Sequence, residues 1–169
     1  MKSFIQQAQM YAAFHQSPQT RSTHFIGVPL IVFSLMILFG FIKIIMPGVF
    51  STNLAVLITV AVLAYYFRLN WQLALPLSLI FIALLWLASW FSQYGPTTLG
   101  IWAFAITFIA GWSLQLYGHY IEGKRPAFMT NLSQALIAPM FLMAETFFMA
   151  GYMHSLKAQI YDVQPEIIL

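Results

Sequence analysis

Four long apolar stretches that carry almost no charge constrain this chain more than any other feature of its sequence. They cover residues 25–45, 49–67, 73–91 and 99–117. Each is close to the roughly 20 apolar residues that a helix needs to cross a bilayer. Only 7% of the 169 residues are charged, whereas an average soluble domain has about 25%. Because so few charges cannot cover a water-facing surface, the sequence predicts an all-α integral membrane protein.

Turn-forming residues separate the four stretches. The connections are MPGVFST at 46–52, RLNWQ at 68–72 and SQYGPTT at 92–98. They contain the Pro, Gly, Asn and Ser that punctuate helices, and connections this short make successive helices antiparallel neighbours. We therefore expect a single membrane domain over residues 1–169, a four- to five-helix transmembrane bundle in which 25–117 form four spanning helices.

The fifth apolar stretch, residues 132–153, lies in the 118–169 segment and allows two arrangements. It contains Pro139 and Glu145, and a lipid-exposed carboxylate at the bilayer centre costs about 3 kcal/mol on insertion scales. The stretch either spans the membrane with Glu145 facing the bundle, or lies shallowly or re-enters. The sequence leaves both arrangements open.

Basic residues predict the orientation of the bundle. They precede the first stretch, lie between the second and third, and follow the fourth; they are Lys2, Arg21, Arg68, Lys124 and Arg125. The positive-inside rule places these segments on the cytoplasmic side, of the inner membrane in a bacterium or of the endoplasmic reticulum in a eukaryote. The net charge of +3 is thus explained by topology, and we expect no nucleic-acid partner.

This topology brings three of the four histidines to one membrane face, which we expect to be cytoplasmic. They are His15, His24 and His119, and His154 joins them only if the fifth stretch does not span.

Residues 1–24 are expected to form an amphipathic helix on the membrane surface, followed by a turn. On an unbroken helix His15 and His24 would point to opposite sides, because they are separated by about 2.5 turns. Pro18 breaks the helix between them. We therefore expect both imidazoles to face one place.

A second polar cluster ends the fourth stretch. The spacing of Gln115, His119 and Glu122 puts these side chains on one helical face, and Gly118 allows another backbone to come close. Three imidazoles and a carboxylate at one interface are typical of a metal site for iron, zinc, copper or nickel, and resemble the ligand sets of non-haem Fe(II) oxygenases. Tyr11 and Gln115 are expected to hydrogen-bond the second ring nitrogens. The chain has no cysteine, which excludes thiolate-ligated sites.

Other interpretations remain open at this point. Interfacial histidines often bridge apolar and wet zones without any ligand, so a non-enzymatic lipid-binding or scaffold protein is an alternative. A di-iron membrane desaturase needs more histidines than the four present. A transporter is disfavoured because no paired broken helices are visible.

Two sequence blocks resemble a known membrane family. The first, YAAFHQSPQTRSTHFIGVP at 11–29, has Tyr–x3–His, a polar turn with proline, and His–x2–Gly–x–Pro. The second, QLYGHYIEGKRPAFMTNLSQALIAPMFLMAE at 115–145, has Gln–x2–Gly–His, Arg–Pro–Ala, Asn–Leu and Ala–Pro. Both blocks resemble the family that includes the fungal endoplasmic-reticulum 2-hydroxy fatty acid dioxygenase of phytosphingosine breakdown. Thr20 departs from the pattern, because many members have Asn there.

The resemblance implies a membrane enzyme that performs Fe(II)-dependent α-oxidation. A long-chain 2-hydroxy fatty acid and O2 would give the fatty acid one carbon shorter, with CO2 and water. The equation RCH(OH)COOH + O2 → RCOOH + CO2 + H2O balances, and the substrate supplies all the electrons, so no further reductant is required. The implied iron ligands are His15, His24 and His119. The oligomeric state is not predicted.

The resemblance also implies roles for other motif residues. Gln115, Glu122 and Arg125 would take part in catalysis, with Glu122 as a fourth ligand or a base. Arg21, Arg125 and Tyr11 would bind substrate, either arginine holding the carboxylate. The positions expected to support the site or the fold are Asn131, Gln134 and Glu145.

Overall fold

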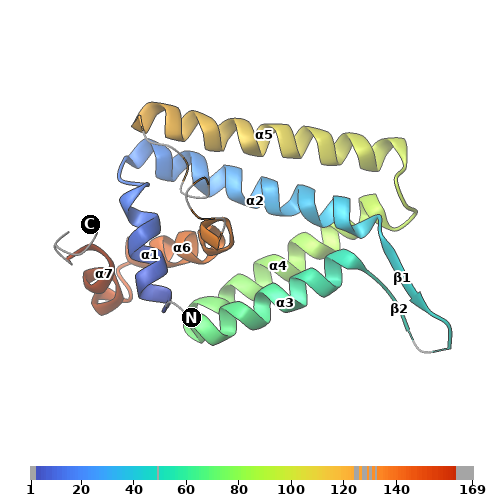
Figure 1. Ribbon diagram of the computed structural model, residues 1–169, viewed down its shortest axis with the longest axis horizontal. Helices are drawn as coiled ribbons and strands as arrows, with labels where there is room; N and C mark the ends of the chain where they lie inside the picture. Colours follow the sequence, from blue (N-terminus) through green and yellow to red (C-terminus); the bar gives the residue numbers. More distant parts are fainter. Residues whose placement is uncertain are drawn as a thin grey trace.

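The computed structural model describes residues 3–48, 50–123, 126, 129, 131 and 133–162. Within these ranges the chain forms helices and one β-hairpin (Figure 1). The helices are α1 (Phe4–Ala13), α2 (Pro18–Gly40), α3 (Leu54–Leu69), α4 (Trp71–Ser92), α5 (Thr98–Glu122), α6 (Ser133–Met149) and α7 (His154–Tyr161). The strands are β1 (Lys43–Met46) and β2 (Phe50–Asn53).

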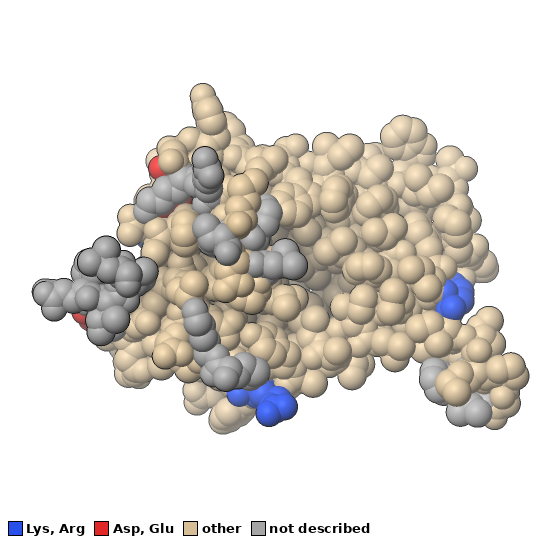
Figure 2. All heavy atoms as spheres, in the orientation of Figure 1, with Lys and Arg blue, Asp and Glu red and all other residues tan. Residues whose placement is uncertain are grey.

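The apolar side chains of the long helices face outward. Helices α2, α4 and α5 are long and apolar enough to cross a membrane, yet only 17–39% of each apolar window is buried inside the protein. The face seen in Figure 2 is almost wholly uncharged over the bundle. Such a surface fits lipid tails rather than water. The predicted all-α membrane bundle is therefore confirmed as the fold class.

The packing of the helices defines two ends of the bundle. Helix α2 packs along α5, and α3 packs along α4. The start of α2 and the end of α5 share one end of the molecule with α1, α6 and α7, while the hairpin lies at the opposite end (Figure 1). The prediction that His15, His24 and His119 share one end is confirmed.

Helix α2 begins earlier than the predicted boundary at residue 25. It starts at Pro18, whose fixed φ suits the first position of a helix and whose missing N–H is not needed there. The break between helices is confined to residues 14–17. Thr20, Arg21 and His24 thus lie on the first two turns of α2, and not in a turn before it.

The expected helix over 25–45 is wrong at its end, because α2 stops at Gly40. The chain then forms an antiparallel hairpin that pairs Lys43 with Asn53 and Met46 with Phe50. β-Branched Ile44 and Ile45 favour strand, and the following Pro–Gly turns the chain with φ +76° at the glycine. The next helix begins at Leu54 and not at residue 49.

The fifth apolar stretch forms helix α6, whose contacts lie at one end of the bundle. Near its start, the carbonyl of Leu136 accepts a hydrogen bond from the hydroxyl of Tyr66 near the end of α3. Near its end, Glu145 pairs with Arg21 at the start of α2. Both contacts lie in the histidine half, and α6 does not extend to the hairpin (Figure 1). Helix α6 therefore stays at the histidine end of the bundle and does not run along its full length.

Glycines bring α2 and α5 into close contact. A Cβ added to Gly118 would collide with Oγ1 of Thr23 and lie 3.3 Å from Cα of Thr20. A Cβ on Gly111 would lie 3.0 Å from the carbonyl oxygen of Gly27. The expected close backbone approach at Gly118 is confirmed. It sets the distance between His24 on α2 and His119 on α5.

We predict that Gly118→Val separates α2 from α5 and destabilises the protein by about 1–3 kcal/mol, the usual cost of overpacking. Thermal unfolding in detergent measures the effect. The matched control is Ser113→Val, at an exposed position of the same helix, which should leave the melting temperature unchanged. Equal melting temperatures for both variants would contradict the close contact.

Candidate metal centre

Helix α1 carries one side of the site and lies across the end of the bundle. It begins with a capping box. The Ser3 hydroxyl oxygen accepts the backbone N–H of Gln6, and the Gln6 side-chain oxygen accepts the backbone N–H of Ser3. Its buried residues recur at helical spacing: Phe4, Gln7, Ala8, Tyr11 and Ala12. This is the amphipathic N-terminal helix predicted from the sequence, and its buried face directs its C-terminal end into the bundle.

Three histidines meet where α1, α2 and α5 converge. His15 follows α1, His24 lies on the second turn of α2, and His119 lies on the last turn of α5; their exposed fractions are 2%, 1% and 5%. Nε2 of His24 is 3.1 Å from Nε2 of His15 and 3.3 Å from Nε2 of His119. Among the described residues this is the cluster that brings three potential metal ligands together.

These distances fit three ligands of one ion. Metal–imidazole bonds of about 2.0–2.1 Å place neighbouring ligand nitrogens roughly 2.8–3.4 Å apart in octahedral or tetrahedral geometry. All three ligand atoms of the cluster lie within 4.8 Å of one another. Two of the nitrogen separations, 3.1 and 3.3 Å, therefore match neighbouring ligands of one ion, and the third pair lies within 4.8 Å.

The second ring nitrogen of His15 fixes the orientation of its imidazole. Nδ1 lies 2.7 Å from the backbone carbonyl oxygen of Tyr11, which only accepts, so the proton is on Nδ1 and Nε2 presents a lone pair. The Tyr11 ring stacks on the imidazole at a centroid distance of 3.8 Å. Tyr11 was expected to support a histidine, and it does so through its backbone and its ring. Burial raises the pKa of the Tyr11 hydroxyl above its ordinary value, so it stays neutral.

His24 is oriented in a comparable way by threonines. Its Nδ1 is 3.4 Å from Oγ1 of Thr23, and the Thr23 hydroxyl donates its own proton to the Thr20 carbonyl at 2.9 Å. The Thr23 oxygen can therefore accept the proton on Nδ1 of His24. As in His15, Nε2 of His24 then presents a lone pair to the cluster. Two buried lone pairs 3.1 Å apart repel each other unless a cation lies between them.

Thr20 joins the two long helices beside the cluster. The Thr20 side chain is fully buried, and its hydroxyl donates to the Gly118 carbonyl at 2.9 Å. Thr20 is one turn before His24, and its acceptor directly precedes His119. This hydrogen bond fixes the spacing of His24 and His119.

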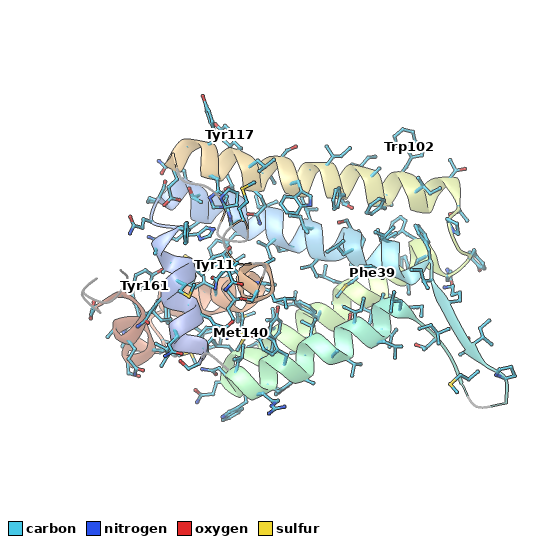
Figure 3. All side chains as sticks on the ribbon, viewed as in Figure 1. Tyr11, Phe39, Trp102, Tyr117, Met140 and Tyr161 are labelled. Atoms are coloured by element: carbon cyan, nitrogen blue, oxygen red, sulfur yellow. The ribbon has the colours of Figure 1, made fainter. Side chains whose placement is uncertain are left out.

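The histidines open into a cavity of about 270 Å³. Its wall holds all three histidines together with Tyr11, Gln115 and Gln134, and continues with apolar side chains as far as Phe39. Figure 3 shows Tyr11 and Phe39 toward opposite ends of the bundle. Of the expected site residues, Gln115 and Tyr11 thus share the cavity with the metal-ligand candidates.

Glu122 contacts the turn between α1 and α2. Its Oε1 accepts the backbone N–H of Gln16 at 2.7 Å. Because Gln16 follows His15 directly, this contact anchors the His15 backbone to the end of α5. Glu122 is absent from the described residues of the cavity wall.

Arg21 and Glu145 form an ion pair beside the cavity. Nη1 of Arg21 donates to Oε2 of Glu145 at 3.1 Å, and Nη2 donates to the carbonyl of Gln16 at 3.2 Å. The Tyr161 hydroxyl donates to the other Glu145 oxygen at 2.7 Å. Burial and this hydrogen bond raise the pKa of Tyr161. The network ties α2, α6 and α7 together, and Arg21 is not among the described residues of the cavity wall.

The other predicted residues lie away from the cluster or beyond the described chain. Asn131 accepts the backbone N–H and the hydroxyl of Ser133 at the start of α6. His154 is exposed at the start of α7 and is not part of the histidine cluster. Arg125 lies outside the described residues.

Sequence reasoning missed Thr23, Trp112 and the apolar wall of the cavity. Thr23 adjoins His24, and Trp112 lies one turn before Gln115 in the wall. Helical spacing from the motif residues identifies Trp112. The wall carries no such signal, because its apolar side chains resemble the lipid-facing ones in composition.

The chain was compared with known proteins. The family model described as "2-hydroxy-palmitic acid dioxygenase Mpo1-like" matches residues 1–150. The yeast (Saccharomyces cerevisiae) protein named 2-hydroxy-palmitic acid dioxygenase MPO1 is 32% identical over 154 residues, which cover 89% of this chain and 83% of the yeast protein. No solved structure matches the chain. By the extent of these two matches, the chain belongs to the Mpo1-like family of 2-hydroxy-palmitic acid dioxygenases.

Proposed function

We propose that this protein is an iron(II)-dependent dioxygenase that shortens long-chain 2-hydroxy fatty acids by one carbon. One observation carries the proposal: three buried imidazole nitrogens converge at the head of an apolar cavity. The name of the yeast relative, a 2-hydroxy-palmitic acid dioxygenase, supports the same substrate class.

The reaction is RCH(OH)COOH + O2 → RCOOH + CO2 + H2O. The bond between C1 and C2 of the substrate breaks, C1 leaves as CO2, and C2 becomes the new carboxyl carbon. O2 accepts four electrons from the substrate, so no nicotinamide, flavin or 2-oxoglutarate is required. Iron(II) held by His15, His24 and His119 would supply the one-electron and O2 chemistry.

The chain's own residues prepare this site. The Tyr11 carbonyl and the Thr23 hydroxyl accept the Nδ1 protons of His15 and His24, which directs the Nε2 lone pairs of both rings toward a shared ion. The burial of all three imidazoles excludes bulk water from the reacting groups. Gln115, in the cavity wall one turn before His119, would contact the substrate head.

The acyl tail fits the apolar part of the cavity. From His24 to Phe39 the α2 backbone advances about 22 Å at 1.5 Å per residue. An extended chain advances about 1.2 Å per single bond, so a palmitic chain measures about 18 Å by the same rule. A tail of this length reaches from the histidines toward Phe39 and Ala55 without leaving the wall.

The proposal also covers membrane orientation and domain organisation. Arg21 near the start of α2 and Arg68 in the last turn of α3 lie at the histidine end, which the positive-inside rule assigns to the cytoplasm. The site would then lie at the cytoplasmic face of a bacterial inner membrane, or of the endoplasmic reticulum in a eukaryote. Residues 1–169 would act as one membrane domain that draws its lipid substrate from the bilayer.

The direct test supplies purified protein in detergent with iron(II), O2 and 2-hydroxypalmitic acid labelled with ¹³C at C1. We expect labelled CO2 and the fatty acid one carbon shorter in equal amounts. Palmitic acid without the hydroxyl group is the control substrate and should not react. Binding of the acid without any labelled CO2 would favour the lipid-binding alternative instead.

We predict that His15→Ala, His24→Ala and His119→Ala each lose most of the bound iron and all measurable turnover. Removing one of three converging ligands leaves the ion with too few donors from the protein. Metal analysis of the purified variants measures this, and His154→Ala is the matched control because His154 is exposed and outside the cluster. Full iron content in all three cluster variants would contradict the ligand assignment.

We predict that Ala55→Phe shortens the preferred substrate. Ala55 is 2% exposed and lines the cavity beside α2, far from the histidines, so a phenyl ring there blocks the end of the tail. The measurement is the ratio of turnover on shorter and longer 2-hydroxy acids, which does not depend on how much protein is folded. Ala61→Phe makes the same change at an exposed position of the same helix and should leave this ratio unchanged. An unchanged ratio in Ala55→Phe would place the tail elsewhere.

A further inference from the structure

We propose that the side-chain amide of Gln134 binds the polar head of the 2-hydroxy acid, donating to the carboxylate and accepting from the 2-hydroxyl group. This inference rests on the proposed function, and it assigns Gln134 direct contact with the substrate instead of a supporting role.

Within the described chain, the side-chain amide of Gln134 is buried without a hydrogen-bond partner. The residue is 1% exposed, and neither Oε1 nor Nε2 has a hydrogen-bond partner within the described part of the chain. Buried polar side chains in folded proteins are almost always hydrogen-bonded. Gln134 lines the cavity. A ligand bound in the cavity is therefore the partner that the geometry provides for its amide.

The start of α6 holds this amide in place. The Gln134 backbone N–H donates to the Asn131 carbonyl at 2.9 Å, which fixes the residue in the first turn. Ala138, one turn further, also lines the cavity. On the same helical face, the Phe141 ring lies 4.8 Å from that of Tyr11, which stacks on His15. One face of α6 therefore borders both the cavity and the support of the metal-ligand candidates.

The chemistry of an amide matches a 2-hydroxy acid. The NH2 group donates to a carboxylate oxygen, and the carbonyl oxygen accepts from the adjacent hydroxyl group. A fatty acid without the hydroxyl group uses only the first of these contacts and leaves the buried carbonyl oxygen unpaired. An enzyme rejects a substrate analogue strongly when binding it would leave a buried polar group unpaired, and only weakly when the analogue differs in size alone.

No described Lys or Arg is available in the cavity wall to bind the carboxylate. Arg21 is paired with Glu145. A neutral amide therefore supplies the donor for the substrate carboxylate on the α6 side of the cavity.

The test compares wild type, Gln134→Met and Gln134→Glu as iron-loaded protein under anaerobic conditions, where the acid binds without turnover. Methionine keeps the length of the side chain and removes both polar atoms, whereas glutamate replaces the donor with an acceptor. Thermal stabilisation by 2-hydroxypalmitic acid and by palmitic acid measures binding, alongside iron content and the melting temperature without ligand. Gln7→Met is the control, since Gln7 is also buried but accepts from Tyr65 and lies outside the described wall.

We expect Gln134→Met to keep its iron and to melt at or above the wild-type temperature without ligand, because it removes unpaired polar atoms. Its half-saturating concentration of 2-hydroxypalmitic acid should rise about tenfold or more, and its preference over palmitic acid should shrink. Gln134→Glu should bind both acids more weakly, and Gln7→Met should keep the wild-type preference.

Unchanged binding in Gln134→Met would overturn the inference. So would a lower melting temperature and iron loss with an unchanged preference between the two acids, which is the behaviour of a structural glutamine. If the wild type turns over 2-hydroxypalmitic acid, either result leaves the proposed function intact. If the wild type binds neither acid, the proposed function fails and the inference falls with it.

Discussion

The structure depends on the burial of three imidazoles whose Nε2 atoms face one another inside an apolar bundle. Two of these rings have their Nδ1 protons directed away, toward the Tyr11 carbonyl and the Thr23 hydroxyl. Their Nε2 lone pairs therefore point toward each other, with the two nitrogen atoms 3.1 Å apart. A shared cation stabilises this arrangement, whereas the two lone pairs repel each other without one. A ring that only anchored a helix at the membrane surface would be expected to snorkel to water, and none of these does.

The rest of the fold serves to hold this convergence. Glycine contacts bring α2 against α5, and the Thr20 hydroxyl locks the two helices beside His24 and its partner. The break at residues 14–17, just before Pro18, turns α1 across the bundle end, while Glu122 holds the residue after His15. The ion pair between Arg21 and Glu145 joins α6 to the same end. Arg21, Glu122 and Glu145 thus position the site, while neutral motif residues line its cavity.

The sequence predicted the membrane fold, the convergence of the three histidines and a helix break next to Pro18, because apolar length, charge placement and proline geometry are local properties. It failed at the hairpin, where Ile44 and Ile45 are as apolar as a membrane helix but favour strand. It left α6 undecided, since only the contacts of Leu136 and Glu145 show that this helix stays at one end. The unpaired amide of Gln134 is invisible in sequence, because pairing depends on tertiary contacts.

X-ray absorption at the iron edge of the purified, iron-loaded protein tests the central claim most directly. Three histidine ligands predict a first shell that contains nitrogen scatterers at about 2.0–2.2 Å, with the outer-shell pattern of three imidazole rings. The pattern should fall to two rings in a variant that lacks one cluster histidine and stay at three in His154→Ala. A first shell of oxygen atoms without imidazole scattering would contradict the claim that these histidines form a metal centre.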